Sequence, residues 1–134
     1  MKRILLIGSL LLFTGAVTYS QAQQNSTTRP VSMTIGQFNP KVTELNTLVG
    51  KKKIDDANAV AIEIQHMMEA DMRAQKYKIR DANEAHNEAD KAHNTELMKN
   101  KISIYTEYNN LKTDLASNQA KVNGKLKEYA ATLN

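Results

Sequence analysis

A run of 73 residues, Lys51 to Asn123, contains neither glycine nor proline. These two residues are the strongest local breakers of regular secondary structure, so a run of this length predicts long helices. Wound as a single helix, the run would extend roughly 110 Å at about 1.5 Å per residue. A chain of 134 residues accommodates such a helix only if it folds back on itself or pairs with other chains. The run therefore constrains the shape of the protein more than its activity.

The N-terminus has the three parts of a secretory signal peptide. Lys2 and Arg3 are basic, an apolar stretch follows over 4–17, and 20–22 place small residues where a signal peptidase reads them. We therefore expect 1–22 to be cleaved and the mature chain to be exported from a bacterial cell, into the periplasm or the medium. The apolar stretch is shorter than the ~20 residues of a permanent anchor. Alternatively, the segment 1–22 is not cleaved and anchors the chain. In that case we expect this segment alone to contact the membrane.

The composition of the mature chain limits its stability and its partners. The sequence has no cysteine, so no disulfide can stabilise it in an oxidising compartment, and it has no tryptophan. Removal of Lys2 and Arg3 lowers the formal net charge from +4 to +2. Such a small charge, on an exported chain, predicts no nucleic-acid partner. Basic clusters such as Lys51–Lys53 leave weak contact with anionic surfaces open.

A flexible polar leader is expected over 23–38. Within it, Val31, Met33 and Ile35 alternate with polar residues, which is the period of a β-strand. A short strand that adds to the sheet of a partner is therefore the alternative interpretation of this segment.

A single helical domain is expected over 39–134, beginning with a short helix at about 40–49. Asn39-Pro40 is a favoured helix start, because asparagine is a good N-cap and proline is tolerated at the first helical position. Gly50 stands where a left-handed C-cap belongs.

Apolar residues recur along 61–133 at a mean spacing of about 3.6 residues, the period of the α-helix itself. The stripe weakens over Arg80–Glu96, where alanines are the only apolar residues. Two apolar segments around a polar centre predict an all-α fold with an elongated helical hairpin. Its two long amphipathic helices are expected at about 55–92 and 95–132.

The tip of this hairpin is expected near 88–95, with Asn94 or Thr95 capping the returning helix. The tip contains no glycine or proline, and its alanines favour helix. One continuous long helix in a parallel coiled-coil oligomer is therefore the alternative fold.

Three polar residues near the tip have the spacing of metal ligands on one helix face. His86, Asp90 and His93 are separated by four and three residues, and imidazole with carboxylate suits zinc or another transition metal. A weak, exposed metal site is one interpretation. Polar residues on a solvated tip are the other, because no cysteine or further histidine nearby completes the ligand set.

Two groups of side chains are candidates for contact with a protein partner. Met67, Met68 and Met72 form a soft apolar patch of the kind found on promiscuous binding surfaces. Tyr105 and Tyr108 supply apolar rings with polar tips on the returning segment. Packing between helices is the simpler explanation for both groups.

No arrangement of residues indicates catalysis or a bound cofactor. The sequence has no nucleophile beside a base and no glycine-rich phosphate loop. We therefore expect a non-enzymatic helical interaction protein of the cell envelope, acting as an adaptor, a spacer or a chaperone-like holding module, through self-association or a protein partner. A small exported protein that binds a metal or ligand through its His/Asp face is the second hypothesis.

Overall fold

A computed structural model describes residues 29–134, and the predicted signal peptide lies outside this range. Within it the chain is helical and contains no strand, so the predicted all-α fold is confirmed. The segments are α3 (Ile35–Gly50), α4 (Ile54–Glu84), α5 (Glu88–Leu111), the short 3-10 turn η3 (Lys112–Asp114) and α6 (Leu115–Ala130).

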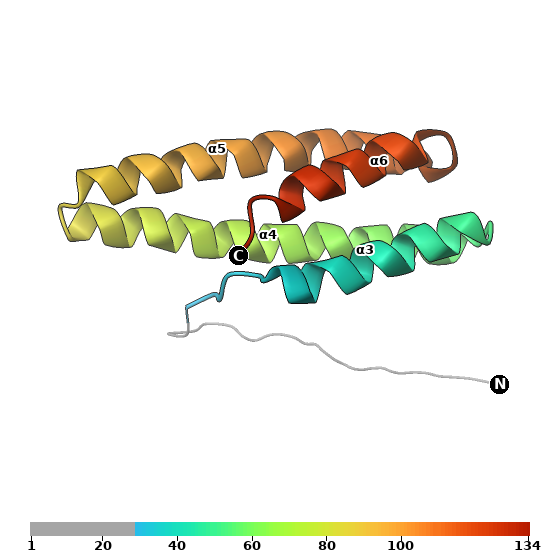
Figure 1. Cartoon of the computed structure of the whole chain (residues 1–134), viewed down its shortest axis with the longest axis horizontal. Coiled ribbons are helices and arrows are strands. Elements are labelled where there is room, and N and C mark those ends of the chain that lie inside the picture. Colours follow the sequence, from blue (N-terminus) through green and yellow to red (C-terminus); the bar gives the residue numbers. More distant parts are fainter. Residues whose placement is uncertain (1–28) are drawn as a thin grey trace.

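The helices run alternately up and down (Figure 1). α4 and α5 form the predicted hairpin, α3 packs on α4, α6 packs on α5, and α3 and α6 contact each other. α4 has 31 residues and α5 has 24, whereas α3 and α6 have 16 each. The hairpin therefore extends past the other two helices on the left of Figure 1. We call this two-helix part, residues 76–84 and 88–96, the tip extension.

The turn of the hairpin lies at 85–87, several residues before its predicted position. Asn87, and not Asn94 or Thr95, is the N-cap of α5, and its side chain accepts a hydrogen bond of 3.1 Å from the backbone N–H of Asp90. His86 adopts a left-handed backbone with φ of 56°. The prediction of the tip was displaced because histidine occupies a position at which glycine is the usual signal.

The returning segment is two helices, so the predicted single helix over 95–132 is wrong. The chain reverses at η3, and Asp114 caps α6 by accepting a hydrogen bond of 3.2 Å from the backbone N–H of Ser117. The side chain of Asn118 donates to the carbonyl of Leu111 at the end of α5. Because α5 and α6 both turn their apolar faces to the same core, the stripe continues through the reversal and gives no sign of it.

The first helix begins at Ile35, five residues earlier than predicted. Thr34 is its N-cap and forms a capping box with Gln37, in which each side chain accepts a hydrogen bond from the backbone of the other residue. Pro40 lies inside the helix, not at its start. The predicted flexible leader is therefore wrong for 29–38, and Met33 and Phe38 within it are buried. Residues 23–28 lie outside the described range.

The turn between α3 and α4 also departs from the prediction. Gly50 is the last residue of α3, and the left-handed residue is Lys52, with φ of 61°. The N–H groups of Lys52 and Lys53 close the helix end by donating to the carbonyls of Val49 and Leu48. This pair of bonds is the Schellman motif, which normally has glycine at the left-handed position.

All four helices contribute to one hydrophobic core. Its largest fully buried apolar side chains are those of Tyr108, Tyr129, Phe38, Leu45 and Ile64. The rings of Phe38 and Tyr129 lie 5.7 Å apart, which joins α3 to α6. None of the helices over 29–134 is long and apolar enough to cross a bilayer.

Candidate functional site

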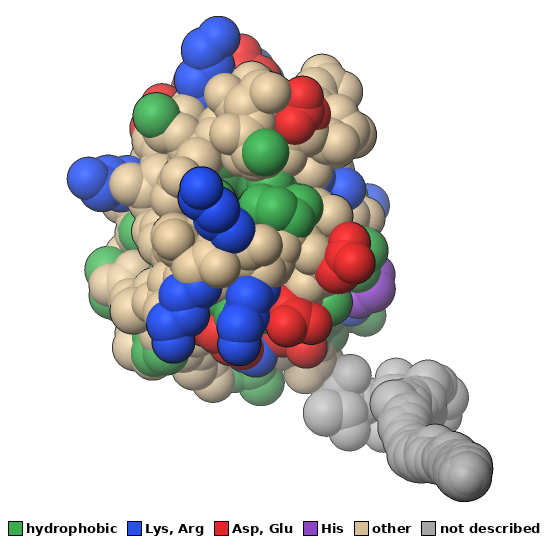
Figure 2. All heavy atoms as spheres, turned by 90° about the vertical axis from the view of Figure 1, so that its right-hand side faces the viewer, with side chains coloured by type: hydrophobic (Ala, Val, Ile, Leu, Met, Phe, Trp, Pro, Cys, Tyr) green, Lys and Arg blue, Asp and Glu red, His purple; other side chains and the backbone are tan. Residues whose placement is uncertain are grey.

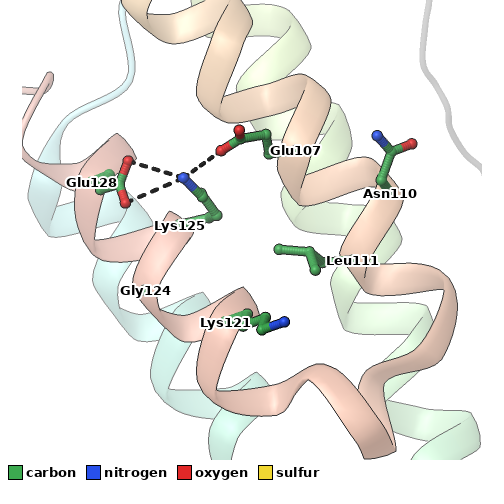
Figure 3. A pocket seen from close by; sticks show the side chains of 7 residues that line it. All are labelled: Glu107, Asn110, Leu111, Lys121, Gly124, Lys125 and Glu128. Atoms are coloured by element: carbon green, nitrogen blue, oxygen red, sulfur yellow. Dashed lines mark hydrogen bonds and ion pairs between the residues drawn. The ribbon is translucent and has the colours of Figure 1, made fainter.

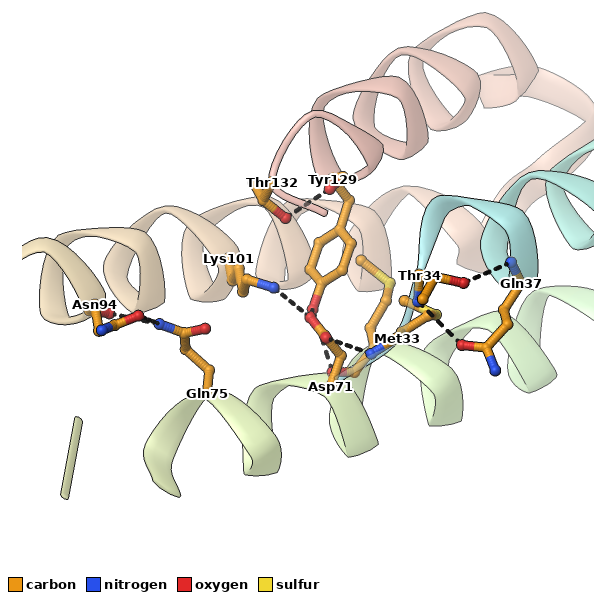
Figure 4. A network of polar contacts seen from close by, with 10 residues as sticks. Met33, Thr34, Gln37, Asp71, Gln75, Asn94, Lys101, Tyr129 and Thr132 are labelled. Atoms are coloured by element: carbon orange, nitrogen blue, oxygen red, sulfur yellow. Dashed lines mark hydrogen bonds and ion pairs between the residues drawn. The ribbon is translucent and has the colours of Figure 1, made fainter. Parts of the chain in front are cut away.

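A buried polar cluster marks the level at which the four-helix part of the molecule ends and the tip extension begins (Figure 4). Asp71 of α4 forms an ion pair with Lys101 of α5, and the two side chains are 1% and 3% exposed. The hydroxyl of Tyr129, from the last turn of α6, donates to the same carboxylate over 2.8 Å. The backbone N–H of Met33 donates to its other oxygen over 3.0 Å.

The helix period brings these side chains together. Asp71 lies three residues after Met68 and seven after Ile64, so it shares their buried face of α4. Lys101 lies seven residues before Tyr108 on the buried face of α5. Both charged residues are therefore directed into the core by the same pattern that directs their apolar neighbours.

The charges in this cluster are compensated. Asp71 accepts three hydrogen bonds, from Lys101, Tyr129 and Met33. The ammonium group of Lys101 also lies 5.3 Å from the centre of the Tyr129 ring, within the range of a cation–π contact. Burial first, and the Asp71 carboxylate second, raise the pKa of the Tyr129 hydroxyl above its ordinary value. A cluster this enclosed offers no position for a substrate, so its role is to fix how four segments of the chain meet.

Both chain ends of the described structure are attached at this level. The N–H of Ile35 donates to the carbonyl of Asn134 over 3.0 Å. Further along, Arg29 forms an ion pair with Asp81 and lies over the ring of Tyr77, with 5.3 Å between the guanidinium carbon and the ring centre. The segment before α3 therefore lies along the tip extension.

The structure does not place the three predicted metal ligands on one helix face. His86 lies in the turn, while Asp90 and His93 belong to α5. The carboxylate of Asp90 accepts a hydrogen bond of 3.2 Å from the side chain of Asn87. Within 29–134 no group of three or more His, Cys, Asp or Glu side chains is arranged to hold a metal ion. The shared face on which the metal hypothesis depended is lost because α4 ends at Glu84.

Most of the predicted partner-binding residues are part of the core. Met68 and Tyr108 are fully buried, Met72 is 9% exposed, and Met67 is half-buried against the core. The hydroxyl of Tyr108 donates to the carbonyl of Ala61 over 2.6 Å, and burial raises its pKa. Packing between helices therefore accounts for these four residues.

Tyr105 is partly buried as well and packs against the core. We use "outer face" for Ile62, Gln65 and Glu69 of α4 together with Ile102 and Tyr105 of α5. The hydroxyl of Tyr105 donates to Glu69, and Gln65 donates to the same carboxylate over 3.1 Å. Partial burial acts to raise the pKa of Glu69, but these two hydrogen bonds outweigh it and lower the pKa.

The outer face also carries exposed apolar surface and an unsatisfied acceptor. Ile62 and Ile102 are 47% and 46% exposed. Asn109, one helical turn beyond Tyr105, has a buried side-chain oxygen with no hydrogen-bond partner among the described residues. Such groups normally find a donor.

A groove lies between α5 and α6 (Figure 3). It has a volume of about 520 Å³. Lys125 of α6 forms an ion pair with Glu107 across the groove and a second one with Glu128 of its own helix, and Gly124 leaves open space where a side chain would stand. Three of the charged groups that line this groove are therefore paired with each other.

The end of the bundle opposite the tip carries both basic and acidic side chains (Figure 2). It carries the turn at 51–53, whose three lysines are exposed, and η3 with Lys112 and Asp114. Acidic side chains lie beside the basic ones in Figure 2. Contact of this end with an anionic surface stays a prediction.

Searches against protein-family models, curated proteins and solved structures found no match for this chain.

The buried cluster was missed by reasoning from the sequence. Lys101 and Gln75 fall on the apolar stripe, and polar residues on a predicted core face signal that a buried partner exists. Gln75 does have one, since its side chain donates to the backbone carbonyl of Asn94 over 2.9 Å. Asp71 gave no such signal, because the spacing of the apolar stripe was counted through its neighbour Met72 and did not place Asp71 on the core face.

Proposed function

We propose that this chain is an exported, non-enzymatic interaction protein of the bacterial cell envelope, acting as an adaptor, a spacer or a holding module. The observation that carries the proposal is the outer face of the hairpin, where Ile62 and Ile102 expose apolar surface on both sides of the Tyr105–Glu69 hydrogen bond. Exposed apolar groups beside polar ones are typical of protein-binding surfaces.

The rest of the molecule is consistent with such a role. The buried charges are paired with each other, and the groove between α5 and α6 is crossed by ion pairs. The long hairpin would hold the outer face at a fixed distance from the end of the bundle that carries the turn at 51–53, as a spacer requires.

Photo-cross-linking in the producing cell tests the proposal. A photoreactive amino acid at 62 or 102 should yield adducts with a defined protein, whereas the same group at exposed Lys127 of α6 should not. The charged variant Ile62→Glu should abolish the adduct formed from 102 while leaving the fold intact. Equal labelling at all three positions, or none at 62 and 102, would contradict the proposal.

Export is tested separately. The mass of the chain recovered from the envelope or the medium should correspond to a start at Gln23. Recovery of the full-length chain from the cytosol would overturn this part.

A further inference from the structure

The turn at the tip closes the hairpin without glycine or proline. The N–H groups of His86 and Asn87 donate to the carbonyls of Asn83 and Ala82, over 3.1 and 2.9 Å, which is a Schellman motif. The left-handed position in this motif is normally glycine, because a Cβ atom strains the backbone there. His86 occupies it with φ of 56°. The hairpin therefore holds backbone strain at its tip.

The sequence on the two sides of the turn is nearly the same. Residues 83–86 are Asn-Glu-Ala-His, and residues 87–90 are Asn-Glu-Ala-Asp. Asn83 lies inside α4, whereas Asn87, in the same local sequence, caps α5. The local sequence is therefore compatible both with a helix that continues through the turn and with a break at the turn. The alanines on both sides of it favour the continuous helix.

We infer that α4 and α5 can join into one continuous helix across 85–87, and that two copies of the chain then exchange halves. In the exchanged dimer, α3 and α4 of one copy pack on α5 and α6 of the other. Each contact between the α3–α4 half and the α5–α6 half is then remade between copies, the Asp71–Lys101 pair included. The two tip extensions become one antiparallel two-helix connection between two bundles.

The balance between the two forms depends on the turn and on concentration. Exchange removes the left-handed histidine from each copy and restores helical hydrogen bonds at the tip. It costs the cap made by Asn87, and it places Glu84 and Glu88 four residues apart on one helix, where like charges repel. Since the remaining contacts are the same in both forms, dimer formation should rise with protein concentration, as in other domain-swapped proteins.

The other turns are poorer hinges. A helix continued through 51–53 would enclose Gly50 and three consecutive lysines, which disfavour it. The turn at η3 is held by Asp114 and by the bond from Asn118 to Leu111. The exchange at 85–87 would occur whether or not the outer face binds another protein.

Pairs of cysteines across each turn distinguish the exchange from ordinary association. The chain has no cysteine of its own, so two can be introduced cleanly and joined by a short bis-maleimide. Lys78 and Asn94 line one hollow on the tip extension and are separated by the turn at 85–87. Lys41 and Glu63, and Lys125 and Glu107, are ion-paired across the other two turns.

After refolding of the mature chain at high concentration, we expect the Lys78→Cys, Asn94→Cys variant to give cross-linked dimers that resist denaturation. The other two pairs should cross-link within one chain in the same dimer fraction. Cross-links between chains at 41 and 63, or at 107 and 125, would assign the hinge to another turn and overturn the inference.

Two substitutions at the tip should move the equilibrium in opposite directions. Asn87→Ala removes the cap of α5 and should increase the dimer fraction severalfold at a given concentration. His86→Gly relieves the strain in both copies and should weaken the dimer by about 30-fold or more. Lys52→Gly makes the same change at the other Schellman turn and should leave the dimer fraction unchanged, so it is the matched control.

Light scattering and the cross-links together decide the outcome. A chain that stays monomeric at every concentration after refolding, as wild type and as Asn87→Ala, would overturn the inference. So would a dimer in which the 78–94 cross-link stays within one chain. If Asn87→Ala fails to fold by circular dichroism, His86→Ala, which favours continuous helix without removing the cap, replaces it.

Discussion

The carboxylate of Asp71 and the ammonium group of Lys101 form an ion pair inside the protein, on facing helices and 30 residues apart in the chain. Both side chains are at most 3% exposed, so each charge depends on the other for compensation. Removing one partner of a buried pair is strongly destabilising, because it leaves an isolated charge in a medium of low polarity. The pair is therefore the most sensitive point of the fold.

We expect Lys101→Met to lower the free energy of unfolding by about 3–5 kcal/mol, the usual range for a broken buried pair. Urea denaturation followed by circular dichroism measures this change. The double variant Asp71→Leu, Lys101→Met should recover part of the loss only, because Tyr129 and Met33 then lose their acceptor. Surface Lys41→Met is the control and should change stability little, since its pair with Glu63 is exposed. A loss at 101 no larger than that at 41 would contradict the assignment.

Lys52→Gly should stabilise the protein by about 1 kcal/mol, because glycine adopts the left-handed backbone of that turn without a steric penalty. The increase should appear as a higher midpoint in urea with an unchanged slope. Lys51→Gly, beside it in the C-cap position with φ of −87°, is the comparison and should not stabilise. Equal effects at 51 and 52 would show that the removed charge, and not the backbone, is responsible.

Gly124→Ala should raise the free energy of unfolding by about 0.5–1 kcal/mol. Gly124 lies inside α6, and a Cβ atom built there meets no other atom within 4 Å. Alanine therefore gains helix propensity with no clash, and thermal unfolding should report the gain. A loss of stability instead would mean that the groove between α5 and α6 must stay open at this point, for example to admit another chain.

The protein should lose stability as the pH rises above about 10, the ordinary pKa of tyrosine. Burial raises the pKa of Tyr108 and of Tyr129 in the folded state, so the unfolded chain releases protons there that the folded chain keeps. The stabilisation is thus complete below the unfolded pKa and is lost on the alkaline side. Urea midpoints between pH 8 and 11 measure the decline, and Tyr108→Phe should make it shallower. A midpoint that is constant over this range would contradict the burial of both hydroxyls.

The helices were predictable because their signal is distributed over many residues. The apolar stripe from Ala61 to Leu133 made the all-α fold and the fold-back evident. The stripe could not locate the reversals, because two consecutive helices both turn their apolar faces to the common core, and the spacing continues from one helix to the next. At Lys52 and His86, tertiary packing holds the chain in a conformation that the residue type opposes, so the local signal was misleading.

The buried cluster was less predictable than the helices. It depends on which charged residues face each other across α4 and α5, and this depends on the position of the tip turn. With the turn displaced by several residues, Asp71 and Lys101 could not be paired. Tyr105 is partly buried against the core and donates to Glu69, so its part in partner binding stays a prediction.

Met33 and Tyr129, near the two ends of the described structure, both donate hydrogen bonds to the carboxylate of Asp71. This arrangement bears on the rates of folding and unfolding. Met33 and Tyr129 reach Asp71 from 38 and 58 residues away, farther along the chain than Lys101. The Asp71–Lys101 contact closes the shorter loop, so the hydrogen bonds that Met33 and Tyr129 donate to Asp71 should form later, after the rate-limiting barrier. Tyr129→Phe should then accelerate unfolding while leaving the folding rate nearly unchanged. The lifetime of the folded molecule, more than the speed of its formation, would be set where α3 and α6 meet.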